Sequence, residues 1–190
     1  NQPQWANEGG DIARTGKSTY DSNVNGEIKW SASVDEITGN LAIDSEGNIY
    51  VTTTNAIYSF DSNGNLRWTY ESTAAGDYFS GIAISRDVII APKVNDTLYL
   101  INQSTGARYG HANLYQGSSY YSPVIDSKGN VYIAGQGDGN NPNLVIIPYK
   151  IWENGGNPTV ISLGGNPVAA PTIIGDGIAV PCDNGLKIVD

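Results

Sequence analysis

The sequence is poor in the residues from which disulfide frameworks and zinc sites are built. Its 190 residues include one cysteine, Cys182, one histidine, His111, and no methionine. A lone cysteine excludes a disulfide within the chain. Because Cys182 lies in an apolar, strand-like run, we expect a buried and unreactive thiol. One histidine and one distant cysteine do not make a zinc site, so we expect His111 to be an ordinary strand-end or loop residue.

Charge is also scarce, and most of it is negative. Ten Lys and Arg stand against 19 Asp and Glu, which gives a net charge of −9. Because nucleic acids and anionic lipids select basic patches, we expect neither as a partner. No apolar stretch approaches the roughly 20 residues of a membrane helix, so we expect no membrane insertion. The opening Asn1–Gln4, without a methionine, is typical of a processed or excised segment, and we predict a secreted, cell-surface or periplasmic protein.

In place of these features the sequence has a repeat of about 41 residues. Ile43–Val51 (IDSEGNIYV) returns as Ile125–Ile133 (IDSKGNVYI), at twice that spacing. Ile84–Ile90 lies midway between them, and Ile174–Val180 is a weaker fourth copy. Each copy is typical of a strand, a tight Asp/Gly turn and a second strand. Such self-similarity indicates a repeat architecture.

Two further strands follow in the repeat. The predicted third strands are Ile57–Asp61, Leu98–Asn102, Leu144–Ile147 and Leu186–Asp190. The predicted fourth strands are Leu66–Trp68, Ala107–Tyr109 and, more weakly, Thr159–Ile161. Four short antiparallel strands in about 40 residues are the blade of a β-propeller. We therefore predict an all-β propeller of four four-stranded antiparallel blades. A lead-in segment (1–25) precedes repeats 26–190, with blades at about 39–71, 80–112, 122–163 and 170–190.

One segment stands outside this order. Gly26–Trp30 (GEIKW) matches the predicted fourth strand Gly64–Trp68 (GNLRW), yet it precedes the first complete blade. The last blade shows only three strands. We expect strand 26–30 to complete the last blade beside Leu186–Val189, either within one chain or in a half-ring completed by a second chain. Either pairing would cover an open sheet edge, which is otherwise an aggregation hazard.

The repeat resembles that of the pyrroloquinoline-quinone (PQQ) enzyme-type, or quinoprotein-like, propeller family. Asn102–Tyr109 (NQSTGARY) is similar to the family signature Asp-x-x-Thr-Gly-Lys-x-x-Trp, and Asp61–Trp68 is another version of it. The opening, from Trp5 to Trp30, resembles the lead-in of non-catalytic secreted and outer-membrane-assembly-type scaffold members. The resemblance implies a propeller, usually of seven or eight blades, whereas four repeats are visible here. It implies no single function, because the repeat occurs in quinoprotein dehydrogenases and in non-catalytic scaffolds.

The residues themselves favour a binding protein over an enzyme. A catalytic quinoprotein would need a stacking aromatic residue, a basic residue near the quinone, a calcium ligand set and a catalytic Asp. We cannot assign these roles to particular residues of this chain. We predict no catalytic residue, no cofactor and no metal site. The leading hypothesis is a secreted or cell-surface binding, adhesion or scaffold module. The alternatives are a fragment of a PQQ-dependent oxidoreductase and a structural subunit of an extracellular assembly.

The repeated Asp and Trp residues have structural interpretations. Asp44, Asp61 and Asp126 each open an Asp-Ser-x-Gly-Asn turn, which could suggest calcium loops. The EF-hand spacing with its terminal Glu is absent, so we predict turns held by side-chain-to-backbone bonds. Trp30 and Trp68 recur at one blade position, which indicates packing between blades.

We expect any ligand on the face where connections enter each first strand, because loops between second and third strands emerge there too. Aromatic pairs at matching places, 78–79 and 120–121, suit stacking on sugar rings or a polar peptide. The alternative is that these rings pack between the second and third blades. The predicted ligand residues are Asp77, Tyr78, Phe79, Asn95, Asp96, Tyr120, Tyr121, Asp138, Asn141 and Asp183. The predicted partner is a protein or carbohydrate, and homodimerisation or other self-assembly is left open.

Overall fold

The computed structural model describes residues 24–72, 78–94, 97–114, 120–136, 141–149 and 157–190, which form four antiparallel sheets. The first sheet contains β1 (Ile37–Ile43), β2 (Ile49–Thr53), β3 (Ala56–Phe60) and β4 (Leu66–Glu71). The second contains β5 (Ala83–Ser85), β6 (Val88–Lys93), β7 (Thr97–Asn102) and β8 (Arg108–Asn113). The third contains β9 (Val124–Ile125), β10 (Val131–Gly135), β11 (Asn143–Ile147) and β12 (Thr159–Ser162). The fourth contains β13 (Thr172–Ile174), β14 (Gly177–Cys182) and β15 (Gly185–Val189).

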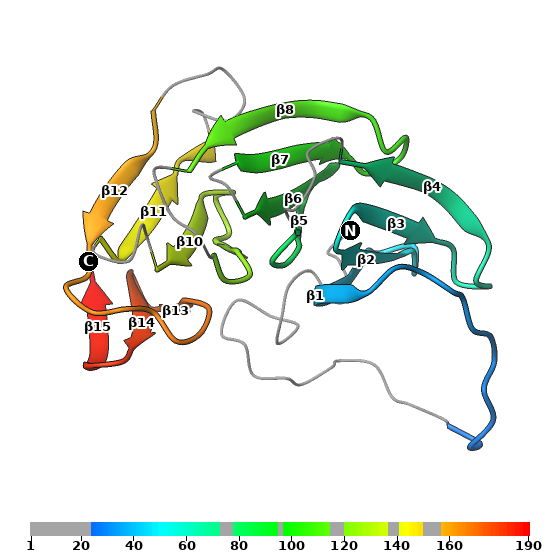
Figure 1. Cartoon of the computed structure of the whole chain (residues 1–190), viewed down its shortest axis with the longest axis horizontal. Coiled ribbons are helices and arrows are strands. Elements are labelled where there is room, and N and C mark those ends of the chain that lie inside the picture. Colours follow the sequence, from blue (N-terminus) through cyan, green and yellow to red (C-terminus); the bar gives the residue numbers. More distant parts are fainter. Residues whose placement is uncertain (1–23, 73–77, 95–96, 115–119, 137–140, 150–156) are drawn as a thin grey trace.

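Each sheet is a meander in which sequential strands pair with one another. Figure 1 shows the four sheets side by side in an open arc, with β1, β5 and β13 on its inner side and β4, β8 and β12 on its outer side. The predicted all-β fold of propeller blades is confirmed. In the described part of the chain the fourth sheet has three strands. No helix there is long and apolar enough to cross a membrane.

The core consists of three apolar layers, one between each pair of neighbouring sheets. Because alternate residues of a strand point to opposite faces, a strand in a middle sheet serves two layers. In β6, Val88 and Ile90 join the layer shared with the third sheet, whereas Ile89 and Ala91 join the layer shared with the first. All six residues of β6 are therefore buried.

The sheets approach one another most closely on the inner side of the arc. A Cβ atom at Gly39 would lie 2.8 Å from the Cα atom of Gly81, and one at Gly81 would lie 2.8 Å from the Cα atom of Ser122. The Asn40 side chain joins these strands: its Oδ1 accepts from the Ile82 N–H at 2.8 Å and from the Ser122 hydroxyl at 3.0 Å. The backbone of β1 and the segments that lead into β5 and β9 therefore approach one another closely, and the Asn40 side chain connects them.

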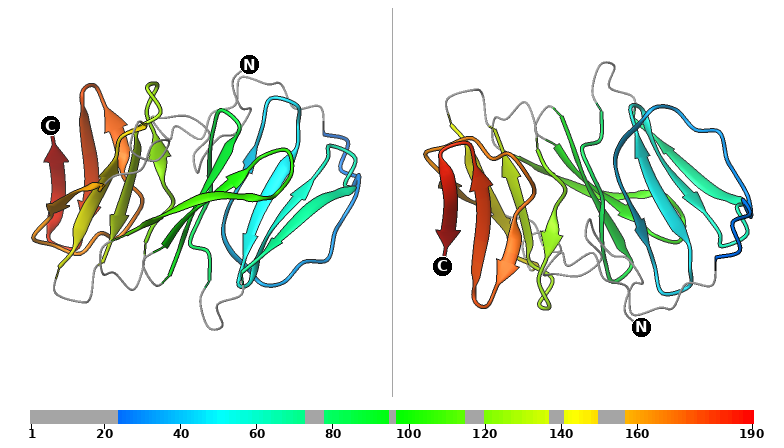
Figure 2. Two further views of the ribbon diagram at one scale, coloured as in Figure 1. Left: turned by 90° about the horizontal axis from the view of Figure 1, so that it is seen from above. Right: turned by 90° about the horizontal axis from the view of Figure 1, so that it is seen from below.

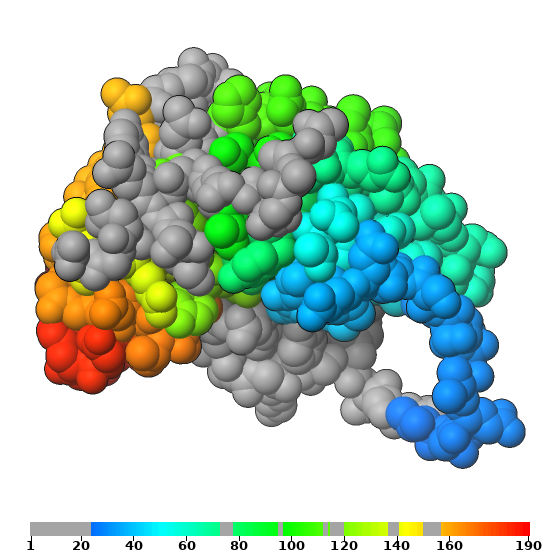
Figure 3. All heavy atoms as spheres, in the orientation of Figure 1, coloured from blue at the N-terminus to red at the C-terminus, as the bar shows by residue number. Residues whose placement is uncertain are grey.

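The expected closure of the ring within one chain is wrong. Residues 26–30 form no strand, and they contact the first sheet rather than β15. Lys29 Nζ donates to the Ser62 carbonyl at 3.3 Å, and the Trp30 ring centroid lies 6.1 Å from that of Phe60. Figures 1 and 2 place this segment at one end of the arc and β15 at the other. In Figure 3 the chain around residues 24–36 stands out from the body of the molecule as an arm.

Candidate functional site

One end of every sheet brings together the two kinds of loop from which we expected a ligand face. In each repeat a main-chain hydrogen bond ties the connection that enters the sheet to the end of the second strand. These bonds run from Thr54 N to Glu36 O, Val94 N to Tyr78 O, Tyr121 N to Ala134 O and Asp183 N to Asn166 O, at 2.8–3.0 Å. Entering connections and second-to-third-strand loops therefore share one face of the arc.

Two of the four predicted aromatic residues are unavailable to a ligand on that face. Phe79 is 0% exposed and packs between the first two sheets, with its ring 5.6 Å from that of Tyr99. Tyr120 is 2% exposed and belongs to the layer between the second and third sheets. Sequence reasoning could not separate ring stacking on a ligand from ring packing between sheets. Tyr120 packs between the second and third sheets, as in the alternative interpretation, whereas Phe79 packs between the first and second.

The remaining predicted residues divide into three groups. Tyr78 is 38% exposed and Tyr121 is half-buried, so their ligand role stays a prediction. Asn141 is exposed, and its carbonyl accepts from Asn143 Nδ2 at 3.2 Å. Asp183 lies in the turn between β14 and β15. The others lie outside the described residues: Asp77, Asn95, Asp96 and Asp138.

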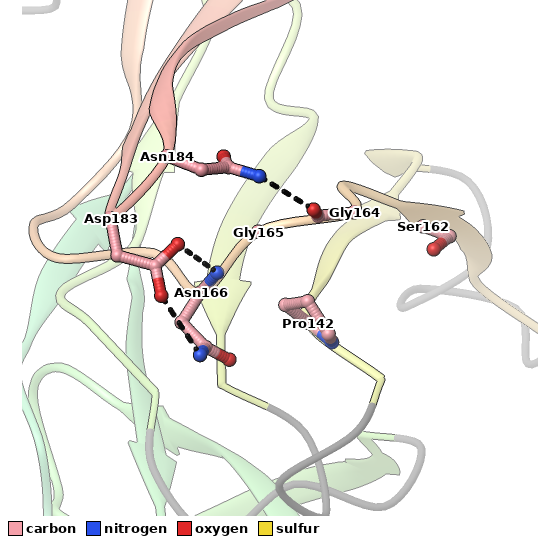
Figure 4. A pocket seen from close by; sticks show the side chains of 7 residues that line it. All are labelled: Pro142, Ser162, Gly164, Gly165, Asn166, Asp183 and Asn184. Atoms are coloured by element: carbon pink, nitrogen blue, oxygen red, sulfur yellow. Dashed lines mark hydrogen bonds between the residues drawn. The ribbon is translucent and has the colours of Figure 1, made fainter.

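Asp183 lines an open cavity of about 610 Å³, which we call the polar groove (Figure 4). Its walls come from the third and fourth sheets and from the connection between them. The lining residues are Pro142, Ser162, Gly164, Gly165, Asn166, Asp183 and Asn184. They belong to the loop before β11, the end of β12, the connection into β13 and the β14–β15 turn. The groove therefore lies on the ligand face predicted from the repeat.

Hydrogen bonds within the lining hold the groove in shape. The Asp183 carboxylate accepts from Asn166 twice, from its main-chain N–H at 2.9 Å and from its side-chain Nδ2 at 3.1 Å. Asn184 Nδ2 donates to the Gly164 carbonyl at 2.8 Å. Figure 4 shows these contacts joining the fourth sheet to the connection before it. A Cβ atom at Gly165 would lie 2.0 Å from Asn184 Oδ1, so any other residue there would displace the Asn184 side chain from this position.

The chemistry of the groove is that of a hydrogen-bonding surface. Asp183 is the only ionisable residue among those lining it, and both of its carboxylate oxygens already accept hydrogen bonds. Ser162 is exposed, and among the described residues no histidine, lysine or second carboxylate lines the groove beside it. Sequence reasoning found Asp183 but missed Ser162, Gly165 and Asn166. The Gly-Gly-Asn run at 164–166, separated by two residues from the predicted fourth strand Thr159–Ile161, is the signal that could have indicated them.

The repeated Asp residues act as turn anchors. Asp126 Oδ1 accepts from the N–H groups of Lys128 and Asn130 at 2.8 and 2.9 Å, and its Oδ2 accepts from the Tyr132 hydroxyl at 3.1 Å. Asp44 makes the equivalent bonds and also accepts from Gln103 Nε2 of the next sheet at 2.7 Å. Within the described residues no group of three or more His, Cys, Asp or Glu could hold a metal ion.

Burial and these hydrogen bonds change the acidity of the groups involved. Burial alone would raise the pKa of Asp44, but hydrogen bonds from Asn48, Tyr50 and Gln103 outweigh it, and the pKa is lowered. Burial, with the hydrogen bond to Asp44, raises the pKa of Tyr50 to about 12. Burial also raises the pKa of the Cys182 thiol, which is 8% exposed. The expectation of a buried thiol is thus confirmed.

The fold is that of a β-propeller, open in this chain, and solved structures of that kind match it. No family model and no curated protein sequence matches. BamB from Moraxella catarrhalis is 14% identical, with a TM-score of 0.62 over 80% of this chain and 42% of its own. Quinohemoprotein alcohol dehydrogenase from Comamonas testosteroni is 20% identical, with a TM-score of 0.60 over 77% of this chain and 25% of its own. BBS1N, solved in complex with ARL6DN, is 13% identical, with a TM-score of 0.54 over 75% of this chain and 45% of its own.

This chain therefore spans less than half the length of these three proteins. The quinoprotein-like resemblance predicted from the repeat is confirmed at the level of the fold. A dehydrogenase and a protein solved in complex with another protein both occur among these neighbours. At these identities the likeness shows the fold and assigns no activity.

Proposed function

We propose that this chain is a non-catalytic binding module of the propeller type, and that its polar groove takes an extended polar segment of a partner protein. The observation that carries the proposal is the lining itself. The groove presents main-chain groups, amides and a hydroxyl on a surface whose single carboxylate is held by two hydrogen bonds. Such a surface suits recognition by hydrogen bonding. It provides no acid–base pair for catalysis.

A protein ligand suits this groove better than a carbohydrate. Sugar rings are commonly recognised by stacking on a flat aromatic side chain, and none of the described lining residues is aromatic. Phe79 and Tyr120, which could have supplied such rings on the same face, are buried between sheets. One neighbour, BBS1N, was solved in complex with another protein. The predicted secreted, cell-surface or periplasmic location belongs to this proposal, as do the adhesion and scaffold roles.

The quinoprotein alternative finds less support in the described residues. A bound quinone needs a flat aromatic or apolar shelf and a basic partner. Among the described residues that line the polar groove there is neither an aromatic side chain nor a basic one. The described residues thus do not fit the cofactor, and we propose no step that uses it.

The experiment is a binding comparison between two serine variants. Ser162→Arg places a long cationic side chain at the groove. Ser127→Arg makes the same change at another exposed serine, in the β9–β10 turn at the opposite end of its sheet. An immobilised library of short peptides selects binders of the native chain, and their affinities are then measured calorimetrically. We expect Ser162→Arg to weaken binding at least about tenfold and Ser127→Arg to leave it unchanged.

Three outcomes would contradict the proposal. Equal affinities for the two variants would place the binding site elsewhere. Binding to a glycan array, with none to peptides, would reassign the ligand to carbohydrate. Oxidation of an alcohol in the presence of added PQQ and calcium, or micromolar binding of PQQ with a matching rise in Tm, would favour the oxidoreductase alternative.

A further inference from the structure

The two ends of the arc carry unpartnered apolar surface. In the fourth sheet Ile178, Val180 and Val189 face the third sheet. The opposite face presents Leu186 and Ile188, which are 64% and 51% exposed. At the other end, Tyr50 and Ile57 of the first sheet face the second sheet. Its free face carries the exposed Leu41 and Leu66 and the half-buried Tyr58. Phe60, on the same face, is buried and contacts Trp30.

The contacts of Trp30 reproduce a contact made inside the arc. Trp68, on the outer strand β4, packs its ring on Gly106 in the turn before β8. A Cβ atom at Gly106 would lie 2.6 Å from Trp68 Cδ2. Trp30 packs in the same way on Gly64, in the turn before β4, where a Cβ atom would lie 2.6 Å from Trp30 Cδ2. Both glycines have positive φ, +71° at Gly106 and +86° at Gly64.

Residues 26–30 form no strand in the single chain, but the position of Trp30 puts them where the outer strand of a sheet preceding the first one would lie. Trp68 makes the equivalent contact with the second sheet. It belongs to β4, the outer strand of the first sheet, and contacts the turn between β7 and β8 of the second sheet. Gly26–Trp30 also shares the pattern of Gly64–Trp68. The three inner strands of this preceding sheet are absent from the neighbourhood of Trp30 in the described residues.

The fourth sheet has the strands that the segment 26–30 lacks, and it lacks an outer strand in the described residues. It supplies the first three strands of a blade, and in the described residues the outer edge of β15 pairs with no strand. An edge of this kind is a template for another strand. It lies at the far end of the arc from the arm formed by residues 24–36 (Figures 1 and 2). One chain thus holds both parts of a complete blade without joining them.

We propose that two copies of this chain associate head to tail into a closed ring, in which Gly26–Trp30 of each copy pairs with β15 of the other as its fourth strand. The free faces of the first and fourth sheets then meet, which continues the sheet-to-sheet packing already present three times within the chain. A head-to-tail contact that closes forms a ring, whereas one that does not close forms a filament. The inference is independent of the polar groove.

The register of the exchanged strand follows from the first sheet. There Trp68 lies opposite Ser59, which lies opposite Tyr50 of β2. In the fourth sheet the residue equivalent to Ser59 is Ile188, opposite Ala179 of β14. Trp30 is therefore expected opposite Ile188 of the second copy. Leu66 lies opposite Phe60 in the first sheet. Ile28 corresponds to Leu66 and Val189 corresponds to Phe60, so Ile28 is expected opposite Val189 of the second copy. Ile28, which is 86% exposed in the single chain, would become covered.

The test is the mass of the chain in solution, measured by sedimentation or light scattering over a range of concentrations. We expect twice the mass of one chain at micromolar concentration. Ile188→Lys places a charge on the proposed contact face and should raise the dimer dissociation constant at least about tenfold. Val160→Lys is the matched control, because Val160 is a similarly exposed strand residue, at 42%, in the third sheet. It should leave the mass unchanged.

A second measurement checks the register and remains informative if a lysine variant unfolds. The variant Ile28→Cys/Val189→Cys, with Cys182→Ala to remove the native thiol, should form a covalent dimer under mild oxidation. The pair Ile28→Cys/Val160→Cys should not. A monomer at all concentrations, a mass that keeps growing with concentration, or a dimer equally sensitive to both lysine variants would each overturn the proposal.

Discussion

Asp44 illustrates how single residues act in this molecule. It is 3% exposed, and its carboxylate accepts bonds from the turn, from the Tyr50 hydroxyl at 2.7 Å and from Gln103 of the second sheet at 2.7 Å. One side chain thus holds a hairpin turn and connects two sheets. A buried carboxylate is stable in this way only when its lone pairs are used.

The lowered pKa of Asp44 predicts how stability responds to acid. The group stays ionised in the folded chain at pH values where the unfolded chain, with its ordinary pKa of 3.8, takes up a proton. Its stabilisation is therefore complete above that value and is lost as pH falls through the lower folded pKa. We expect Asp44→Asn to reduce the free energy of unfolding at neutral pH by about 2–4 kcal/mol. We also expect the variant to lose less of its remaining stability in acid.

Urea unfolding at a series of pH values, from neutral to below about 3, measures both effects. The control is Asp176→Asn, at an exposed position in the β13–β14 turn. It should keep the acid dependence of the native chain. If Asp44→Asn and the native chain lose stability in parallel as pH falls, the carboxylate does not have the role that its hydrogen bonds indicate.

At the scale of elements, neighbouring sheets are joined by a tryptophan of one and a glycine turn of the next. Trp68 is half-buried, its Nε1 donates to the Gln103 carbonyl at 3.0 Å, and its ring lies on Gly106. The positive φ at Gly106 suits glycine for conformational reasons. The close approach of the Trp68 ring also favours glycine at position 106, because a Cβ atom there would collide with the ring.

These two requirements can be separated by mutation. We expect Trp68→Ala to cost about 2–3 kcal/mol, below the range for a fully buried aromatic side chain because the ring is partly exposed. Gly106→Ala should cost a similar amount, since it adds a collision with Trp68 to the strain of a positive φ. In the double variant the collision disappears, so the combined cost should fall below the sum of the two.

Gly175→Ala provides the control for φ alone. Gly175 has a φ of +56°, and a Cβ atom there would meet nothing within 4 Å. Its cost should be about 1 kcal/mol. Thermal or urea unfolding of the four variants completes the cycle. Strict additivity of Trp68→Ala and Gly106→Ala would mean that the ring and the turn do not interact.

For the whole molecule, the arc implies a gradient of local stability. The second sheet has a neighbour on each face, and every residue of β6 is buried. The fourth sheet has a neighbour on one face, and β15 alternates between exposed and partly buried residues. In repeat architectures each unit is stabilised mainly by its nearest neighbours. Units at an end with one neighbour should therefore open more readily.

Hydrogen exchange followed by mass spectrometry tests this gradient. The Ile188→Lys variant is the right sample, because self-association would protect the ends. We expect the amides of β6 and β7 to exchange slowest and those of β13 and β15 to exchange fastest. Uniform protection across the four sheets would show that the arc unfolds as one cooperative unit.

The amino-acid sequence alone determined the repeat, the four antiparallel sheets and the turns at Asp44, Asp61 and Asp126. These features depend on local spacing, because alternation and turn chemistry act between residues close in the chain. It also indicated the packing of Trp30 and Trp68, which recur at one position of the repeat. The tertiary structure decided that Phe79 and Tyr120 face neighbouring sheets, that Ser162, Gly165 and Asn166 meet Asp183 in one groove, and that residues 26–30 lie against the first sheet. Each of these depends on which surfaces meet across distant parts of the chain, and periodicity along a strand carries no information about the partner that its face will bury.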